Sequence, residues 1–221
     1  MDSKTRNFLI VLFLVSFILR ITLAFLSPLK YWDETIYANL GRNLLIYKEY
    51  SFLHGFADFS PNWPLSSFRP PLLPFFISII SFFSFNVFFL NFLVPIISSF
   101  GVIGFFLLSK KLFNKEIAVY SSVFFAIFFM NIFWGSKILT DTVFLTMIIF
   151  SAYFFWVSFF ESSLSYKPAI FFGVFSALAF LTRYSFIYFA PLFFITLLFK
   201  HKNIKFIVGK KLLLSILVFF I

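Results

Sequence analysis

Long apolar stretches separated by short polar ones run along the whole chain. A helix needs about 17 to 25 apolar residues to cross the hydrocarbon core of a membrane. Phe8–Leu29 has this length and lacks a small-residue cleavage site, so we interpret it as an anchor rather than a removed signal peptide. Three further stretches qualify, namely Asn86–Ser109, Ala118–Trp134 and Ile138–Phe160. The pattern predicts an all-α, polytopic membrane protein.

The apolar stretch Pro168–Phe199 is too long for a single span, and Arg183 divides it near its middle. An unpaired guanidinium at the centre of a bilayer is costly. We therefore expect two short tilted helices, Pro168–Thr182 and Tyr184–Phe199, with a turn at Arg183.

The last apolar stretch, Leu212–Ile221, is too short to span a membrane. Either it is shallow and includes Phe206–Val208, or it begins a seventh span. Counting it as the start of a span gives about seven transmembrane helices, in one membrane domain over residues 1–221. The short last segment also leads us to expect the N-terminal part of a longer protein.

Pro70–Phe85 is marginal in length for a span, and prolines crowd its start. We interpret it as a helix that lies at the membrane interface without crossing, so that residues 30–85 form an outer loop with interfacial helices. The N-terminus and most Lys and Arg residues then lie inside, as the positive-inside rule requires.

An alternative topology lets Pro70–Phe85 cross and puts the N-terminus outside. Charge counting alone does not reject it. The alternative separates Asp33 and Glu34 from Asp141 and Arg183, whereas the first topology gathers all of them on one outer face.

Composition agrees with the membrane class. Of the 221 residues, 62% are hydrophobic, 12% are charged and 43 are Phe, a balance far from that of soluble domains. The formal net charge of +10 comes from short basic clusters between apolar runs, which favours membrane orientation over nucleic-acid binding. Cysteine is absent, so no disulfide or thiolate chemistry is available.

Adjacent acids open the outer loop, and the segment that carries them has a helical pattern. Apolar residues recur every four positions from Trp32 to Leu44, which is typical of an amphipathic helix on a membrane surface. Asp33 and Glu34 can act as a general base or hold a divalent cation such as Mg²⁺ or Mn²⁺. Alternatively, Asp33 caps the helix and Glu34 is solvated. Tyr37 shares a neighbouring face with Asp33.

Three further charged residues are candidates for the same outer face. Asp141 lies where a span begins, as a helix cap or as part of a site. Arg183, between its two half-spans, binds an anion or a lipid headgroup, or alternatively snorkels to the membrane surface. Arg69 begins the interfacial helix, where a guanidinium can hold phosphate through several donors. We expect Arg20 to pair within the bundle or to snorkel outward, and we assign no metal to the lone His54.

A set of motifs resembles a known family. In chain order they are Trp32-Asp33-Glu34 with Tyr37-Ala38, Arg69-Pro70-Pro71-Leu72, Thr140-Asp141, and Leu178-Ala179-Phe180-Leu181-Thr182-Arg183. Together they resemble the GT-C glycosyltransferases, in the branch of the protein O-mannosyltransferases and the lipid A aminoarabinose transferase. The similarity covers most of the chain.

The resemblance implies an enzyme that moves a sugar from a polyprenyl phosphate to an acceptor hydroxyl. Asp33 would serve as the base, with Glu34 and Asp141 supporting the catalytic site. Arg69, Arg183 and Tyr37 would bind the lipid phosphate. The first outer loop would contain interfacial helices, one of which precedes the second span without crossing.

We therefore expect an inverting membrane glycosyltransferase with its catalytic loop outside the plasma membrane and its N-terminus in the cytoplasm. Its partners would be a polyprenyl-phosphate sugar, a hydroxyl on a protein, lipid or glycan, and membrane lipids, without nucleic acid. A transporter subunit and a non-catalytic membrane fragment are the alternatives.

Overall fold

The structure is a computed structural model that describes residues 2–27, 32–51, 69–83, 86–161, 165–200 and 209–221. Within these ranges every regular element is helical, which confirms the predicted all-α membrane class. The helices are α1 (Ser3–Leu26), α2 (Trp32–Ile46), α3 (Leu72–Phe83), α4 (Val87–Leu90), α5 (Leu93–Leu112), α6 (Lys115–Ile127), α7 (Phe129–Gly135), α8 (Thr140–Phe159), α9 (Lys167–Thr182), the 3₁₀ helix η2 (Tyr184–Tyr188), α10 (Ala190–Lys200) and α12 (Lys210–Phe220).

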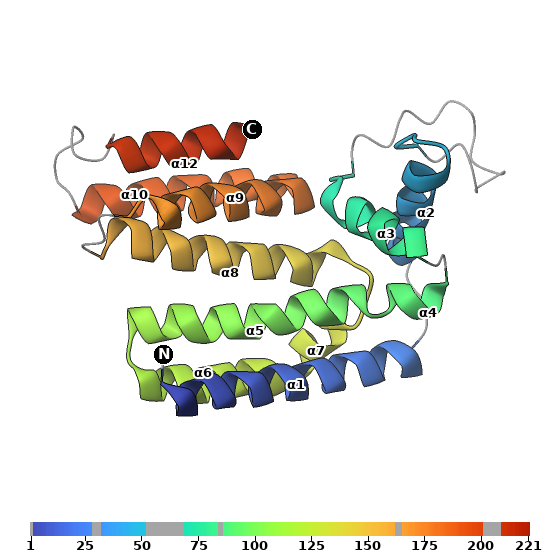
Figure 1. The fold of residues 1–221 in the computed structure, drawn as a ribbon, viewed down its shortest axis with the longest axis horizontal. Helices are drawn as coiled ribbons and strands as arrows, with labels where there is room; N and C mark the ends of the chain where they lie inside the picture. Colours follow the sequence, from blue (N-terminus) through green and yellow to red (C-terminus); the bar gives the residue numbers. More distant parts are fainter. Residues whose placement is uncertain (1, 28–31, 52–68, 84–85, 162–164, 201–208) are drawn as a thin grey trace.

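The long helices lie side by side in a bundle. In Figure 1, α1 and α6 form one side, α5 and α8 the middle, and α9, α10 and α12 the other side. Among the described residues, three helical segments are long and apolar enough to cross a membrane, or four if α6 and α7 count as one span bent by 58°. The expected number of about seven is not confirmed, because α9, α10 and α12 are short.

The predicted turn at Arg183 is confirmed. Helix α9 ends at Thr182, Arg183 has an extended backbone with φ −151° and ψ 122°, and η2 begins at Tyr184. The chain then returns through α10 alongside α9 (Figure 1).

Helices α2 and α3 form a separate pair at one end of the bundle (Figure 1). The predicted amphipathic helix is α2, and its Ile36 and Leu40 are buried. Gly41 lets the two helices approach closely, since a Cβ atom there would lie 2.4 Å from Cγ2 of Ile77. Helix α1 ends and α5 begins at this same end, so α3 does not traverse the bundle. This position of α3 agrees with the topology in which Pro70–Phe85 does not cross, and that topology stays a prediction.

The opposite end of the bundle, which carries the N-terminus, has a different chemistry. Lys115 Nζ lies 3.1 Å from Asp2 Oδ2, and Lys111 Nζ lies 2.6 Å from Glu161 Oε1. Lys211 Nζ donates to the Ser158 carbonyl oxygen at 3.1 Å. These lysines belong to the basic clusters that the sequence places on the inner side, and they gather at the end remote from α2 and α3.

A cluster of buried apolar side chains joins the elements next to α2 and α3. It contains Leu73 of α3, Leu90 of α4, Val143 of α8, Ala179 of α9 and Phe186 of η2. Burial of apolar area and close van der Waals contact hold these elements together. The cluster thereby positions the first turns of α2 and α8 near the end of α9.

Candidate functional site

An ion pair joins the first turn of α2 to the segment just before α3. Arg69 Nη2 donates to Asp33 Oδ1 at 2.7 Å, and the two side chains are 22% and 44% exposed. The Arg69 guanidinium also lies over the Tyr37 ring, 5.6 Å from its centroid. Burial by itself would lower the pKa of Arg69, but Tyr37 and the Asp33 carboxylate outweigh it and raise that pKa. Arg69 is therefore a fixed cation beside a half-exposed carboxylate.

Tyr50 anchors the backbone that carries Arg69. Its hydroxyl donates to the Arg69 carbonyl oxygen at 2.8 Å and to that of Pro70 at 3.2 Å. Burial, and then the nearby phenols of Tyr184 and Tyr37, raise the pKa of Tyr50 well above its ordinary value. The hydroxyl thus stays protonated and keeps its role as a donor.

Glu34 does not share the environment of Asp33. Its side chain is 2% exposed, and Oε1 accepts a hydrogen bond of 2.9 Å from the backbone N–H of Ile138. The alternative expectation that Glu34 is solvated is therefore wrong. The side chains of successive residues in a helix point about 100° apart. The Asp33 side chain is therefore partly exposed, while the Glu34 side chain faces the protein interior.

Lys137 secures the same segment from its other side. Its Nζ atom donates to the carbonyl oxygen and to Oγ of Ser27, at 2.8 and 2.7 Å, and the side chain is 1% exposed. Residues 136–139, which connect α7 to α8, are thus attached to the ends of both α1 and α2. The sequence offered no signal for this burial, since Lys137 reads as a solvated loop lysine.

Asp141 and Arg183 form a second ion pair at this end. Arg183 Nη1 donates to Asp141 Oδ1, and both side chains are about half exposed. Asp141 does not cap α8, because the N-cap position is Leu139 and no side chain caps it. The capping alternative for Asp141 is therefore wrong. Two carboxylate–arginine pairs thus lie at this end of the bundle, with Asp33 on α2, Arg69 before α3, Asp141 on α8 and Arg183 directly after α9.

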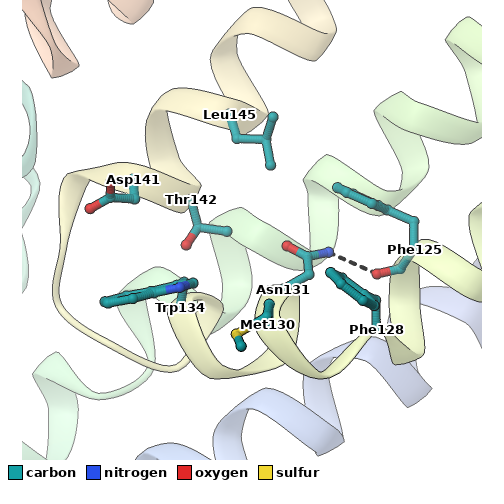
Figure 2. A pocket seen from close by; sticks show the side chains of 8 residues that line it. All are labelled: Phe125, Phe128, Met130, Asn131, Trp134, Asp141, Thr142 and Leu145. Atoms are coloured by element: carbon teal, nitrogen blue, oxygen red, sulfur yellow. Dashed lines mark hydrogen bonds between the residues drawn. The ribbon is translucent and has the colours of Figure 1, made fainter.

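A pocket of about 270 Å³ opens beside Asp141. Figure 2 shows its walls: Phe125 comes from the end of α6, Phe128 lies between α6 and α7, and Thr142 and Leu145 come from α8. Met130, Asn131 and Trp134 of α7 complete the lining. Most of the lining is apolar, with Asp141 at the edge, so the pocket suits an apolar group attached to a charged one.

The described residues contain no group of three or more Asp, Glu or His side chains that could hold a metal ion. Asp33 and Asp141 are each engaged with an arginine instead. The acidic pair does not fit a divalent cation, since Glu34 turns away from Asp33 to the Ile138 amide. His54 lies outside the described residues.

The fold and the site define a class of protein: an all-α membrane protein with charged groups gathered at one end of its helical bundle. A family model described as dolichyl-phosphate-mannose-protein mannosyltransferase matches residues 68–221. The chain belongs to this family, whose members are membrane glycosyltransferases of the GT-C type. The matched region includes Arg69, Asp141 and Arg183 and begins after Asp33 and Glu34. Comparisons with curated proteins and with solved structures give no match.

Proposed function

We propose that this protein transfers a sugar, of the mannose type or a related one, from a polyprenyl-phosphate donor to a hydroxyl of a protein, lipid or glycan. The family supports a membrane glycosyltransferase. The observation that carries the finer proposal is the pairing of two half-exposed carboxylates with two arginines at one end of the bundle. Carboxylates can take a proton, and guanidinium groups bind phosphate through several donors.

Asp33 is the general base in this proposal. Its carboxylate removes the proton of the acceptor hydroxyl while the hydroxyl oxygen forms a bond to the anomeric carbon. The bond between that carbon and the phosphate oxygen breaks, and its electron pair leaves with the lipid phosphate. A single displacement of this kind inverts the anomeric centre. The leaving phosphate is an anion, so the reaction needs no general acid, unlike glycoside hydrolysis.

Arg69 and Arg183 hold the phosphate, with Tyr37 supporting Arg69 from beneath. Negative charge grows on the phosphate oxygen as the sugar departs, and fixed cations stabilise that charge most when they need no rearrangement. The Tyr50 hydrogen bonds to the Arg69 backbone and the Tyr37 ring under its guanidinium fix one cation in advance. Asp141 orients the other through its ion pair with Arg183.

The apolar pocket beside Asp141 supports a lipid-linked donor. An isoprenoid segment next to the phosphate needs an apolar surface adjoining a cationic group. Phe125, Leu145 and Trp134 provide that surface close to the Asp141–Arg183 pair. We place the first isoprene units of the donor here.

Glu34 supports the site without touching the reactants. Its hydrogen bond to Ile138 attaches the first turn of α2 to the segment that leads into α8, and so keeps Asp33 and Asp141 in a constant relation. In this proposal Asp33 and Asp141 remain open to substrate, and Glu34 is a positioning residue.

The site faces the outer side of the plasma membrane, and the N-terminus lies in the cytoplasm. The distribution of lysines supports this orientation, because Lys111, Lys115 and Lys211 gather at the opposite end of the bundle. The partners are the donor lipid, the acceptor hydroxyl and the surrounding membrane lipids, and nucleic acid has no role.

The proposal is tested with purified protein in vesicles that contain a polyprenyl-phosphate sugar and an acceptor with a free hydroxyl. We expect the unsubstituted protein to transfer sugar and Asp33→Asn to transfer none while it keeps its thermal stability. Asp2→Asn, which changes a carboxylate at the other end of the bundle, is the matched control and should retain activity. Normal transfer by Asp33→Asn contradicts the assignment of the base.

A further inference from the structure

Arg20 is buried within the bundle rather than snorkelling to a membrane surface. Its side chain is 0% exposed. Nη1 donates to the Ser16 carbonyl oxygen at 3.0 Å, to Ser16 Oγ at 2.6 Å and to the Ala126 carbonyl oxygen at 3.2 Å. Within the described ranges Nε and Nη2 have no hydrogen-bond partner, and no carboxylate there pairs with the guanidinium. A buried cation of this kind needs a compensating negative potential.

The compensating potential comes from the break between α6 and α7. Helix α6 ends at Ile127, Phe128 is extended, and α7 continues at an angle of 58°. The last carbonyl groups of a helix lack intrahelical donors and carry the negative end of its dipole. Two of them receive side-chain donors here: Asn131 Nδ2 lies 2.8 Å from the Phe125 oxygen, and Arg20 Nη1 reaches the Ala126 oxygen.

The neighbouring residues leave room for the guanidinium. A Cβ atom on Gly135 would lie 2.8 Å from Arg20 Nε and 3.0 Å from Ser98 Oγ. Any side chain larger than glycine at this position therefore displaces Arg20. In membrane proteins the C-terminal ends of broken helices coordinate cations, and here the cation is a side chain of the protein itself.

We propose that Arg20 is a positioning residue whose guanidinium acts as a tethered cation at the C-terminal end of α6 and holds the break from which the donor pocket is formed. The pocket exists because the chain bends: Phe125 lines it before the break, Phe128 lines it at the break, and Met130, Asn131 and Trp134 line it after. Without the cation the Ala126 carbonyl loses its donor, and α6 and α7 tend to join into one straight helix that removes the pocket. The inference rests on the proposed function only for the identity of the pocket's ligand.

Arg20→Ala combined with chemical rescue tests the proposal. The variant removes the cation and leaves a cavity that fits free guanidinium. Thermal unfolding in detergent and sugar transfer in vesicles are measured with guanidinium chloride far below denaturing concentrations, and with potassium chloride or urea in its place. We expect the variant to melt several degrees lower and to show a KM for the donor raised at least tenfold. We also expect guanidinium chloride, but neither potassium chloride nor urea, to restore most of the melting temperature and to bring the KM for the donor most of the way back. Arg6→Ala, an exposed arginine of the same helix, should change neither quantity and respond to no additive.

Two outcomes overturn the proposal: an Arg20→Ala variant as stable as the parent protein, or a loss that guanidinium does not reverse. If the unsubstituted protein transfers no sugar, the proposed function fails, and the melting measurements still decide the role of Arg20.

Gly135→Ala tests the same contact when Arg20→Ala does not accumulate, because its methyl group pushes the guanidinium away. Its matched control is Gly104→Ala, whose Cβ would meet Ile149 and Phe150 at 3.1 Å. Gly135→Ala should raise the KM for the donor and Gly104→Ala should not, and equal KM values contradict the proposal.

Discussion

Arg69 Nη2 lies 2.7 Å from Asp33 Oδ1, although the two residues are 36 positions apart in the chain. The contact exists because α2 and α3 pack closely at Gly41 and Ile77 and because Tyr50 fixes the backbone of Arg69. The proposed base therefore begins the reaction beside a cation. In the proposed reaction, a donor phosphate bound to Arg69 lies next to the carboxylate that takes the acceptor proton.

Arg183 is expected to bind the donor phosphate. Arg183→Ala should weaken donor binding by about tenfold to a hundredfold, since hydrogen bonds to charged groups contribute about 1.5 to 3 kcal/mol. Arg183→Lys keeps the charge and should weaken binding less. Equilibrium binding of a fluorescent polyprenyl phosphate measures both, with Arg6→Ala as the control. Equal affinities of the Ala and Lys variants for the polyprenyl phosphate would show that Arg183 does not bind the phosphate.

Glu34 and Asp33 are expected to respond differently to the loss of their charge. Glu34→Gln keeps an oxygen that can accept from the Ile138 N–H and should retain most of the stability and the transfer activity. Glu34→Ala leaves that buried N–H without its acceptor and should cost about 1 to 3 kcal/mol of stability together with much of the activity. Transfer rates and melting temperatures measure the difference. A folded Glu34→Gln variant as inactive as Asp33→Asn would assign Glu34 to the chemistry.

Tyr50 is expected to make stability depend on alkaline pH. Its pKa in the folded protein is raised above the ordinary value of 10.0, so above that pH the folded state still holds a proton that the unfolded state has released. The stabilisation is complete below pH 10 and falls as pH rises further. Tyr50→Phe should flatten this part of the pH profile and lower stability at neutral pH by about 1 kcal/mol through the lost hydrogen bonds.

Melting temperatures from neutral to alkaline pH measure the Tyr50 effect. Tyr120→Phe is the matched control, because Tyr120 is 69% exposed on α6 and belongs to none of the contacts around Arg69. If the melting temperature of Tyr50→Phe falls with alkaline pH as steeply as that of the parent protein, groups other than Tyr50 cause the fall.

The orientation of the site can be measured because the sequence contains no cysteine. Asn39→Cys on α2 and Tyr188→Cys on η2 report on the end with the two ion pairs, and the exposed Lys110→Cys reports on the other end. We expect a membrane-impermeant maleimide to label the first two in intact cells and the third only after permeabilisation. Opposite labelling of the α2 and η2 cysteines would mean that the two ion pairs do not share one face.

Much of the fold follows from the sequence because its causes are local. The length of an apolar stretch decides whether it can cross a membrane, and Ile138–Phe160 accordingly forms α8 nearly over the predicted range. The cost of a mid-membrane guanidinium likewise predicts the turn at Arg183. The expected number of spans was not confirmed, because α9, α10 and α12 have 16, 11 and 11 residues, fewer than the roughly 17 that one span needs.

The charged residues of the site could be named from the sequence, but their partners could not. Asp33, Asp141, Arg69 and Arg183 stand at the ends of apolar segments, and the topology argument gathers them at one end. The pairing of each acid with its arginine depends on how α2, α3, α8 and α9 pack. A local sequence pattern does not predict this packing.

The sequence by itself determined the membrane class, the turn at Arg183 and the set of charged residues, because hydrophobicity, length and charge act along the chain. The tertiary structure alone decided that Asp33 is open while Glu34 is buried, and that Lys137 and Arg20 lie inside the bundle. Burial and hydrogen-bond partners depend on residues distant in sequence: Glu34 meets Ile138 and Arg20 meets Ala126 only after the helices pack. Packing thus separates a half-exposed carboxylate paired with an arginine from a buried carboxylate that joins α2 to the segment before α8.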